Sequence, residues 1–525
     1  MALIDHDIEG RTPPRYTELH ASFTPDEQAV LPQLKRFFEC YEGDKELRDN
    51  LIAGGAKPEQ LALLKEIGIT FDINELAPMW QRRDLFERAL REPEGEANAE
   101  VLQMMDAHPL LKLWGRFTLR KAELYIEQRR WVTTTPSASA KYTAWRRRRI
   151  QATRSELGAY GYNIDHPSLA IELALGCSVG CYFCAFDAPK LQQTFDINVP
   201  ENRELFRGIS ASLMKHLGWS VGHALLYWST EPADNPHYIK FMEEFLDVTG
   251  STVCTATARA DEQWVSSLLA HYRRLQQPWP RISVLTRSIM YKVMKRFTPE
   301  EARDMTLLMQ QKDGEEMRLK VPGGRDKMLA RLETYEDLRE KGTDRRPEDM
   351  VVPQGSIACV SGFLINILQK SIKVISPCYT TAEYRYGYRT FAEVTFTDAA
   401  DFDRKITELI DSKMVFEPYD EMPMKLRDDL KYHEIAGGFQ VRSREQVHEC
   451  TGNPIYGPLG ALLHEGTSTY SQVVDALVDR HELDPMMVSA IIRSLFDQGF
   501  LSELEVMAPG HQDEAEGTPL QLSVN

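Results

Sequence analysis

Residues 172–187 read ELALGCSVGCYFCAFD and place Cys177, Cys181 and Cys184 in a C-x-x-x-C-x-x-C array. Three of the eight cysteines in the 525-residue chain therefore lie within eight positions. The apolar run at 169–175 is short enough for a buried strand, and a glycine ends it just before the first thiol. The pattern predicts a strand followed by a loop that carries three thiolates.

Thiolates are the ligands of iron–sulfur clusters, and a [4Fe–4S] cube usually takes four of them. The next cysteine after Cys184 is Cys254, so one iron of a cluster bound here would be left without a protein ligand. Structural zinc is the first competing interpretation, but it takes four ligands, commonly from paired C-x-x-C units, and the sequence has no second pair. Buried cysteines clustered by chance are the second, which the strand–glycine–loop context disfavours.

The three-cysteine array resembles the radical S-adenosylmethionine (SAM) superfamily, and so do the aromatic residues Tyr182 and Phe183 before the last cysteine. The resemblance implies an α/β fold with a partial (β/α) barrel. It implies a [4Fe–4S] cluster held by Cys177, Cys181 and Cys184, with SAM bound through its amino and carboxylate groups at the open iron. Tyr182 and Phe183 would then lie beside the cofactors.

Length and composition bound the other possibilities. A chain of 525 residues should form two or three domains, and 42% hydrophobic with 27% charged residues is typical of a globular protein. A formal net charge of −16 argues against a nucleic-acid partner. The N-terminus has no apolar signal region and no run reaches the roughly 18 apolar residues of a membrane span. We therefore expect a cytoplasmic protein with no membrane contact and with reduced cysteines.

Residues 1–130 are expected to form a helical N-terminal domain, because amphipathic runs recur from residue 25 onward. Its segment 37–80 resembles the helical leader of nitrogen-fixation-associated precursor peptides, although an ordinary helical hairpin that caps the catalytic domain explains the pattern equally well. Residues 131–165 are interpreted as a linker with a basic run. The four arginines at 146–149 are expected to lie on a solvated helix face.

From 166 to 400 apolar strands alternate with helices, the pattern of parallel βα units, and we assign this range to the radical SAM catalytic domain with its C-terminal extension. The strand at 224–228 ends in Ser-Thr-Glu-Pro. By resemblance, Thr230 and Glu231 would replace the Gly-Gly-Glu-like motif that accepts hydrogen bonds from the SAM ammonium group.

Three more strands are expected at 252–257, 282–287 and 316–324. The second would supply Ser283 and Arg287 to the ribose and carboxylate of SAM, since the carboxyl ends of barrel strands converge on one mouth. The first contains Cys254, which is either a buried strand residue or a thiol in the barrel lumen.

Ser-Pro-Cys at 376–378, the tyrosine-rich run at 384–388 and the motif WSTEPADNP at 228–236 agree in order with the cysteine array. Together they resemble the PoyD-like radical SAM epimerases of ribosomal peptide maturation, over roughly residues 140–400. The resemblance implies conversion of L- to D-residues in a precursor peptide such as a proteusin. This sequence departs from the family pattern at two places: Ala185 stands where glycine is expected, and Tyr-Arg-Tyr at 384–386 replaces a Trp-Pro pair. Both departures concern the shape of the substrate pocket more than the radical chemistry.

Such a reaction needs one more cysteine. A 5′-deoxyadenosyl radical would take the α-hydrogen, and inversion requires a hydrogen atom from the opposite face, which a thiol can donate. We prefer Cys378 because Ser-Pro before it fixes a turn and Gly387 follows, as in a loop over a barrel mouth. Cys359, within the apolar run 357–367, is the alternative and is more naturally a buried residue.

Residues 420–506 are expected to form a separate C-terminal domain with a hairpin at 438–450 and three helices between 454 and 498. This order resembles a winged-helix-like fold, specifically the PqqD-like element that binds leader peptides. Its acidic composition disfavours DNA and favours peptide binding by strand addition. Residues 507–525 are expected to be a disordered tail.

The resemblance implies as partners a ribosomal precursor peptide, with its leader and core, and an electron donor such as a flavodoxin or ferredoxin. Two other functions stay open. A radical SAM enzyme that forms crosslinks through auxiliary clusters would need further grouped cysteines, whereas Cys254, Cys359, Cys378 and Cys450 are scattered in the sequence. A non-catalytic leader-binding scaffold would not turn over SAM.

Overall fold

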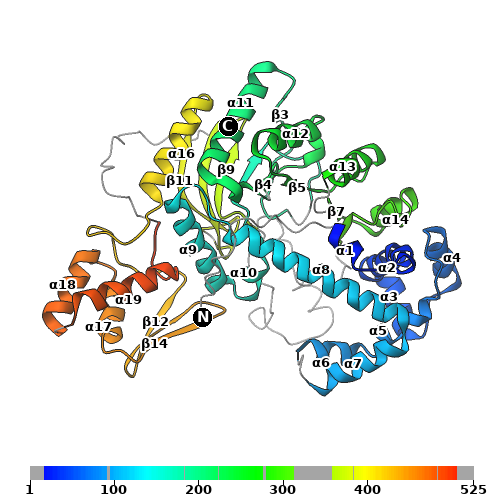
Figure 1. Ribbon diagram of the computed structural model, residues 1–525, viewed down its shortest axis with the longest axis horizontal. Coiled ribbons are helices and arrows are strands. Elements are labelled where there is room, and N and C mark those ends of the chain that lie inside the picture. Colours follow the sequence, from blue (N-terminus) through cyan, green and yellow to red (C-terminus); the bar gives the residue numbers. More distant parts are fainter. Residues whose placement is uncertain are drawn as a thin grey trace, which may run out of the picture.

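The computed structural model describes residues 17–91, 95–181, 184–222, 224–275, 280–311, 358–381, 383–481 and 483–504. Figure 1 shows a mixed α/β centre with helices on one flank, drawn in blue, and a small α/β unit on the other, drawn in orange and red. The long helix α8 (Pro109–Thr134) runs from the blue helices to the centre.

The N-terminal part is helical, as the amphipathic pattern predicts. Thr24 begins α2 with a capping box: its hydroxyl accepts from Glu27 N at 3.3 Å, and the Glu27 carboxylate accepts from Thr24 N at 2.9 Å. The remaining elements of this part are α1 (Thr17–Ala21), α2 (Pro25–Gly43), α3 (Lys45–Ala53), α4 (Pro58–Glu66), η1 (Ile73–Leu76), α5 (Pro78–Gln81), α6 (Arg83–Arg91) and α7 (Glu96–Ala107).

These helices share one hydrophobic core with the segment around residues 282–309. Phe37 of α2 lies in the same buried cluster as Ile282 of β7 (Arg281–Val284) and Met290 of α14 (Arg287–Arg296). The buried Arg36 guanidinium donates to Met294 O at 3.0 Å and to Phe297 O at 2.6 Å, at the end of α14. The packing agrees with a helical cap; the leader-like resemblance of 37–80 stays a prediction.

The centre holds a six-stranded sheet in the order β11-β10-β9-β1-β4-β5. Strands β9, β1, β4 and β5 are parallel, whereas β10 and β11 are antiparallel additions. The bounds are β1 (Leu169–Glu172), β4 (Ala224–Leu225), β5 (Val253–Cys254), β9 (Gly362–Asn366), β10 (Ser371–Pro377) and β11 (Tyr388–Thr395).

A parallel three-stranded sheet, β6-β7-β8, continues from the first, because β6 (Ala256–Thr257) follows β5 after a single residue. The predicted strands at 224–228, 252–257 and 282–287 are present in shorter form. The strand expected at 316–324 lies outside the described residues. The sequence analysis missed β8 (Thr306–Met309), which pairs with β7.

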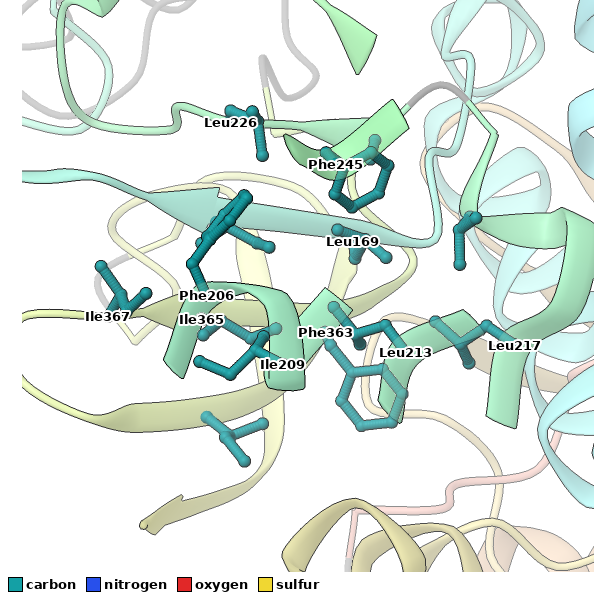
Figure 2. Close-up of a cluster of buried hydrophobic side chains, with 14 of the residues drawn as sticks. Leu169, Phe206, Ile209, Leu213, Leu217, Leu226, Phe245, Phe363, Ile365 and Ile367 are labelled. Carbon is teal, nitrogen blue, oxygen red and sulfur yellow. The ribbon is translucent and has the colours of Figure 1, made fainter. Parts of the chain in front are cut away.

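One face of the large sheet is covered by α11 (Pro200–Leu217), α12 (Tyr238–Thr249) and α16 (Ala399–Lys413). Apolar residues of α11 recur every three or four positions and meet alternate residues of β1 and β9 (Figure 2). We call this the helix-covered cluster. Its labelled members in Figure 2 are Leu169, Phe206, Ile209, Leu213, Leu217, Leu226, Phe245, Phe363, Ile365 and Ile367.

The other face carries a second apolar set, which we call the inner cluster. Strand alternation places Ala170 of β1 and its neighbours Leu225 and Leu364 on this face, opposite the residues of Figure 2. Its buried members are Ala170, Leu225, Trp228, Ala358, Val360, Leu364 and Ile375, and Phe186, Tyr227, Cys254, Cys359 and Tyr388 pack against them.

The basic run at 146–149 is not solvated, contrary to expectation. It lies in α9 (Ala140–Leu157), where Arg146, Arg148 and Arg149 are buried and Arg147, the second of the four, is exposed. Arg148 pairs with Glu503 at 2.6 Å, and Arg149 pairs with the other oxygen of the same carboxylate. Burial of these cations is possible because a fully buried carboxylate and carbonyl oxygens satisfy them.

The C-terminal unit has three antiparallel strands and three helices. The hairpin and the helices are present as predicted, and Asp484 begins the last helix by accepting from Met487 N at 2.9 Å. Two strands were expected here, but the sheet has three, because β12 precedes the predicted hairpin. The elements are β12 (Lys431–Ile435), β13 (Gly438–Arg442), β14 (Val447–Thr451), α17 (Tyr456–Glu465), α18 (Tyr470–His481) and α19 (Pro485–Asp497).

Across the described part of the chain, every helix is too short or too polar to cross a membrane.

Candidate cluster and cofactor site

The three-cysteine loop begins where β1 and the short β2 (Ala174–Leu175) end. Cys177 N donates to Pro189 O at 2.9 Å, and Leu191 N donates back to Cys177 O at 3.2 Å, which closes the loop at its base. Gly176 adopts a φ of 82°, and a Cβ there would lie 2.3 Å from Lys190 O. The glycine before the first cysteine is therefore required for the loop to close.

The three thiols lie close together and half-buried, and none of them forms a disulfide. Burial raises the pKa of Cys181 to about 12, and the nearby Cys177 and Cys184 raise it further. Burial also raises the pKa of Cys177, although the N–H groups of Val179 and Gly180 oppose the shift. Such thiols hold their protons at neutral pH until a metal displaces them.

The residues of the loop fit a [4Fe–4S] cluster with three protein ligands. In the described ranges, no three His, Cys, Asp or Glu side chains converge as on one metal ion. In a cubic cluster each thiolate binds a different iron, so the sulfurs lie farther apart than the ligands of a single ion. Three thiols on one short, partly exposed loop match the cluster better than a zinc site.

The cysteine loop is tied to the end of β4. Ser178 N donates to Asp234 Oδ2 at 2.8 Å, and the Ser178 hydroxyl donates to the other oxygen of that carboxylate. Asp234 belongs to η3 (Pro232–Asp234), in the WSTEPADNP motif. The motif can be read from the sequence, but the role of Asp234 cannot, because its partner Ser178 lies 56 residues away.

Glu231, predicted to contact SAM, joins two strand ends. Its carboxylate is 5% exposed and accepts from Ala258 N at 2.8 Å, from Ala233 N at 3.0 Å and from the hydroxyl of Thr257. Burial raises its pKa, and these hydrogen bonds oppose the rise. Most acceptor positions of Glu231 are thus taken within the chain, and the neighbouring Thr230 is half-buried.

The other predicted SAM contacts are not brought together. Ser283 is half-buried on β7, on the same face as Arg281. Arg287 begins α14 instead of ending the strand, and its guanidinium binds Asp44 at 2.9 Å and Glu46 at 3.1 Å in the N-terminal helices. Arg287 is therefore directed to the helical cap. Tyr182 and Phe183 lie outside the described residues.

Aromatic side chains connect the cysteine loop to the inner cluster. Phe186, two residues after Cys184, packs on Trp228 with ring centroids 4.8 Å apart, and Trp228 meets Tyr388 edge-on at 6.3 Å. Glu172 holds the segment after β4, since it accepts from Ser229 N at 3.1 Å. The apolar side chains of the inner cluster thus lie directly beside the cysteine loop, where the iron–sulfur cluster is predicted.

Two thiols lie against the inner cluster, Cys254 and Cys359. Tyr227 packs against the same cluster, and its hydroxyl accepts from the Arg281 guanidinium at 3.2 Å. Burial raises the pKa of Cys359 to about 12, so its S–H stays protonated at neutral pH. Cys254 is a half-buried strand residue at the end of β5, packed against the inner cluster, and its place in a barrel lumen stays a prediction.

The position of Cys378 agrees only in part with a loop over the barrel mouth. The connection between β10 and β11 reaches the cysteine loop, where Arg385 pairs with Asp187 at 2.5 Å. The Cys378 thiol itself is fully buried, beside the Glu156–Arg389 ion pair rather than in the inner cluster. Burial raises its pKa, so this thiol is also protonated at neutral pH.

Comparisons with known proteins name no function. No family model matches the sequence. The uncharacterized protein y4wI of Sinorhizobium fredii is 28% identical over 490 residues, which cover 91% of this chain and 89% of that protein. The crystal structure of BtrN in complex with AdoMet and 2-DOIA aligns with 47% of this chain and 87% of BtrN, at 10% identity and a TM-score of 0.26. A TM-score this low carries no weight for fold or function.

Proposed function

We propose that this chain is a radical SAM enzyme, cytoplasmic and with a partial (β/α) barrel, that converts L- to D-residues in a ribosomally synthesised precursor peptide. The observation that carries the proposal is the loop of Cys177, Cys181 and Cys184 at the end of β1. Three thiols there leave one iron of a [4Fe–4S] cluster open for SAM.

When bound, the cluster and SAM would supply the radical that abstracts a hydrogen atom. The residues of the chain hold and shield it. Asp234 fixes the cysteine loop through Ser178, and Phe186 packs the segment after the last cysteine against the apolar inner cluster. An apolar surround suits a carbon radical, which has no charge to solvate and needs protection from side reactions.

Hydrogen return is assigned to a cysteine thiol, with Cys378 first and Cys359 second. The segment after Cys378 contacts the cysteine loop through Arg385, which favours Cys378. Its thiol is fully buried, so the connection between β10 and β11 must shift when peptide binds. Strand ends do not separate the two thiols. Cys359 precedes β9, and Cys378 follows the antiparallel β10, so both lie at the amino end of β9, whereas the cysteine loop follows the carboxyl end of β1.

Peptide recognition is assigned to the C-terminal unit. Among the residues that the structure describes, strand β12 pairs on one side alone, with β13, and most of its residues are exposed. The other edge strand, β14, is joined to α9, where His448 lies 3.1 Å from Ser155 Oγ. An extended leader segment would therefore add to β12, and its linkage to the core peptide would raise the effective concentration of the core at the site. The electron donor in this proposal is a flavodoxin or ferredoxin.

A crosslinking radical SAM enzyme is the less favoured function. Auxiliary clusters need grouped thiolates. Cys254 and Cys359 lie against the inner cluster, Cys378 lies beside the Glu156–Arg389 pair, and Cys450 is buried in the core of the C-terminal unit. The described cysteines outside the first loop thus form no set of three around one point.

Turnover of the precursor peptide in D₂O tests the proposed reaction. A thiol S–H exchanges with solvent, so each inverted residue should carry one deuterium on its α-carbon, whereas crosslinking would lower the peptide mass. Cys378→Ala should still cleave SAM but lose the D-residues, because the carbon radical lacks its donor. Chiral analysis of the hydrolysed peptide gives the yield.

Cys450→Ala is the matched control, since this buried thiol lies far from the proposed chemistry. It should keep both deuterium and D-residues, and Cys359→Ala should mainly cost about 1 kcal/mol of stability. Full D-residue yield from Cys378→Ala, or loss in Cys359→Ala alone, would move the donor away from Cys378. Peptide without deuterium in every variant and in wild type would contradict epimerisation itself.

A further inference from the structure

Trp228 carries a buried donor without an acceptor. Its side chain is 7% exposed, and its Nε1–H has no hydrogen-bond partner among the described residues. Buried indole N–H groups are normally paired, and leaving one unpaired costs free energy. Trp228 lies two residues before Thr230, in the inner cluster beside the cysteine loop. A ligand that enters this site would meet an available N–H.

The surroundings of Trp228 select the kind of acceptor. Its ring packs on Phe186 and Tyr388, and the buried members of its cluster are all apolar. The Glu172 carboxylate, which binds the segment after Trp228, is already bound to Ser229 and Asn366. An anionic acceptor would lose its hydration among the apolar side chains around the indole, which is unfavourable. A neutral amide carbonyl satisfies the N–H at no such cost.

We propose that Trp228 is a positioning residue that donates its indole N–H to a backbone carbonyl of the peptide residue being modified. This inference rests on the proposed peptide substrate and adds a residue that the sequence analysis did not single out. The side chains packed around the indole are aliphatic and aromatic, so we take the residue held there to have an apolar side chain. The hydrogen bond would fix the α-carbon relative to the cysteine loop, which raises the fraction of productive encounters.

The test compares Trp228→Phe with wild type in the reconstituted holoenzyme. Phenylalanine keeps an aromatic ring against Phe186 but removes the donor. The probe is acetyl-valyl-alanyl-valine amide, an uncharged apolar peptide, and its affinity is measured by calorimetry. Binding should weaken about three- to tenfold in Trp228→Phe, as expected for one hydrogen bond, while SAM affinity stays unchanged.

Trp145→Phe is the matched control. Trp145 is also buried with an unpaired Nε1–H, but it belongs to the helix-covered cluster. Its replacement should leave peptide affinity within twofold of wild type. In a second series, esters replace single amides of the probe; the ester that removes the bonded carbonyl should weaken wild type and leave Trp228→Phe unaffected.

Equal peptide affinity of Trp228→Phe and wild type would overturn the inference, as would failure of wild type to bind the probe. Weaker SAM binding with unchanged peptide binding would assign the N–H to SAM instead. The proposed function is tested separately in the same samples, because SAM cleavage to 5′-deoxyadenosine without peptide does not need this hydrogen bond. If Trp228→Phe binds the peptide as well as wild type does but SAM is still cleaved, the inference fails and the radical SAM assignment is unaffected.

Discussion

His166 shows how one buried side chain couples the fold to pH. It is fully buried, with Nδ1 2.9 Å from Ser361 Oγ and Nε2 3.3 Å from Gly161 O. Its carbonyl oxygen accepts from the buried Arg146. Burial lowers the pKa of His166 to about 3, and nearby arginines lower it further. The neutral ring therefore joins the start of β1 to the start of β9.

Acid should destabilise the protein through His166. Between pH 6.5 and pH 3 the unfolded chain binds a proton that the folded chain does not, so stability falls as pH falls through this window. From pH 6.5 to pH 5 the loss amounts to about 2 kcal/mol for this group. Urea unfolding at pH 7 and pH 5 measures the difference.

His166→Gln removes the titrating group and should reduce that pH dependence, even if its stability at pH 7 is lower. His271 keeps a share of the dependence, since burial lowers its pKa to about 4. The matched control is His433→Gln on the exposed β12, which should behave as wild type. An unchanged difference between pH 7 and pH 5 in His166→Gln would rule out this residue as its source.

Strand β12 is the element on which peptide recognition depends. A two-residue turn of Ala436 and Gly437 joins β12 to β13, and Ile435 pairs with Gly438 next to it. In an antiparallel pair, hydrogen-bonded and non-hydrogen-bonded positions alternate. His433 thus bonds inward to β13, and Glu434 directs its N–H to the free edge.

Glu434→Pro should weaken leader-peptide binding by about tenfold or more, because it removes an edge N–H and places a ring where an added strand would lie. Glu434→Ala is the control, since it changes the same exposed side chain but keeps the N–H. Fluorescence anisotropy with a labelled leader peptide measures both variants. Equal losses in the two variants would attribute the effect to the carboxylate and contradict strand addition.

Elements with strong patterns could be predicted from the sequence. The apolar run at 169–175, the strand at 224–228 and the three C-terminal helices are present because each is a continuous apolar or amphipathic segment. β12 was missed because its side chains are mostly exposed and polar. β8 is as long as the predicted β7, but a short apolar run does not by itself distinguish a strand from a buried helix segment.

At the scale of the whole molecule, α9 joins the units that the sequence divides. Arg148 and Arg149 pair with Glu503, more than 350 positions away along the chain. From the same helix Glu156 binds Arg389 at 2.5 Å and accepts from Tyr379 N at 2.9 Å. The C-terminal unit is thereby connected to the segment of Cys378.

In the candidate site too, features formed by residues close in sequence could be predicted, whereas contacts between residues far apart in sequence could not. Cys177, Cys181 and Cys184, the predicted cluster ligands, are close in sequence, so their spacing alone predicts a common loop, and the structure places them in one. The contacts of Asp234 and Arg287 could not be read from the sequence, because their partners Ser178 and Glu46 lie 56 and 241 residues away. The burial of the arginine run likewise depends on Glu503, which no local pattern connects to α9.

The most direct test of the account is the iron content and SAM cleavage of the anaerobically reconstituted protein. We predict four irons and four sulfides per chain, and 5′-deoxyadenosine on reduction with dithionite in the presence of SAM. The variant with Cys177, Cys181 and Cys184 all changed to alanine should lose both, while Cys40→Ala, which alters a fully buried thiol of α2, should lose neither. Four irons retained in the triple variant, or no 5′-deoxyadenosine from fully loaded wild type, would contradict the account.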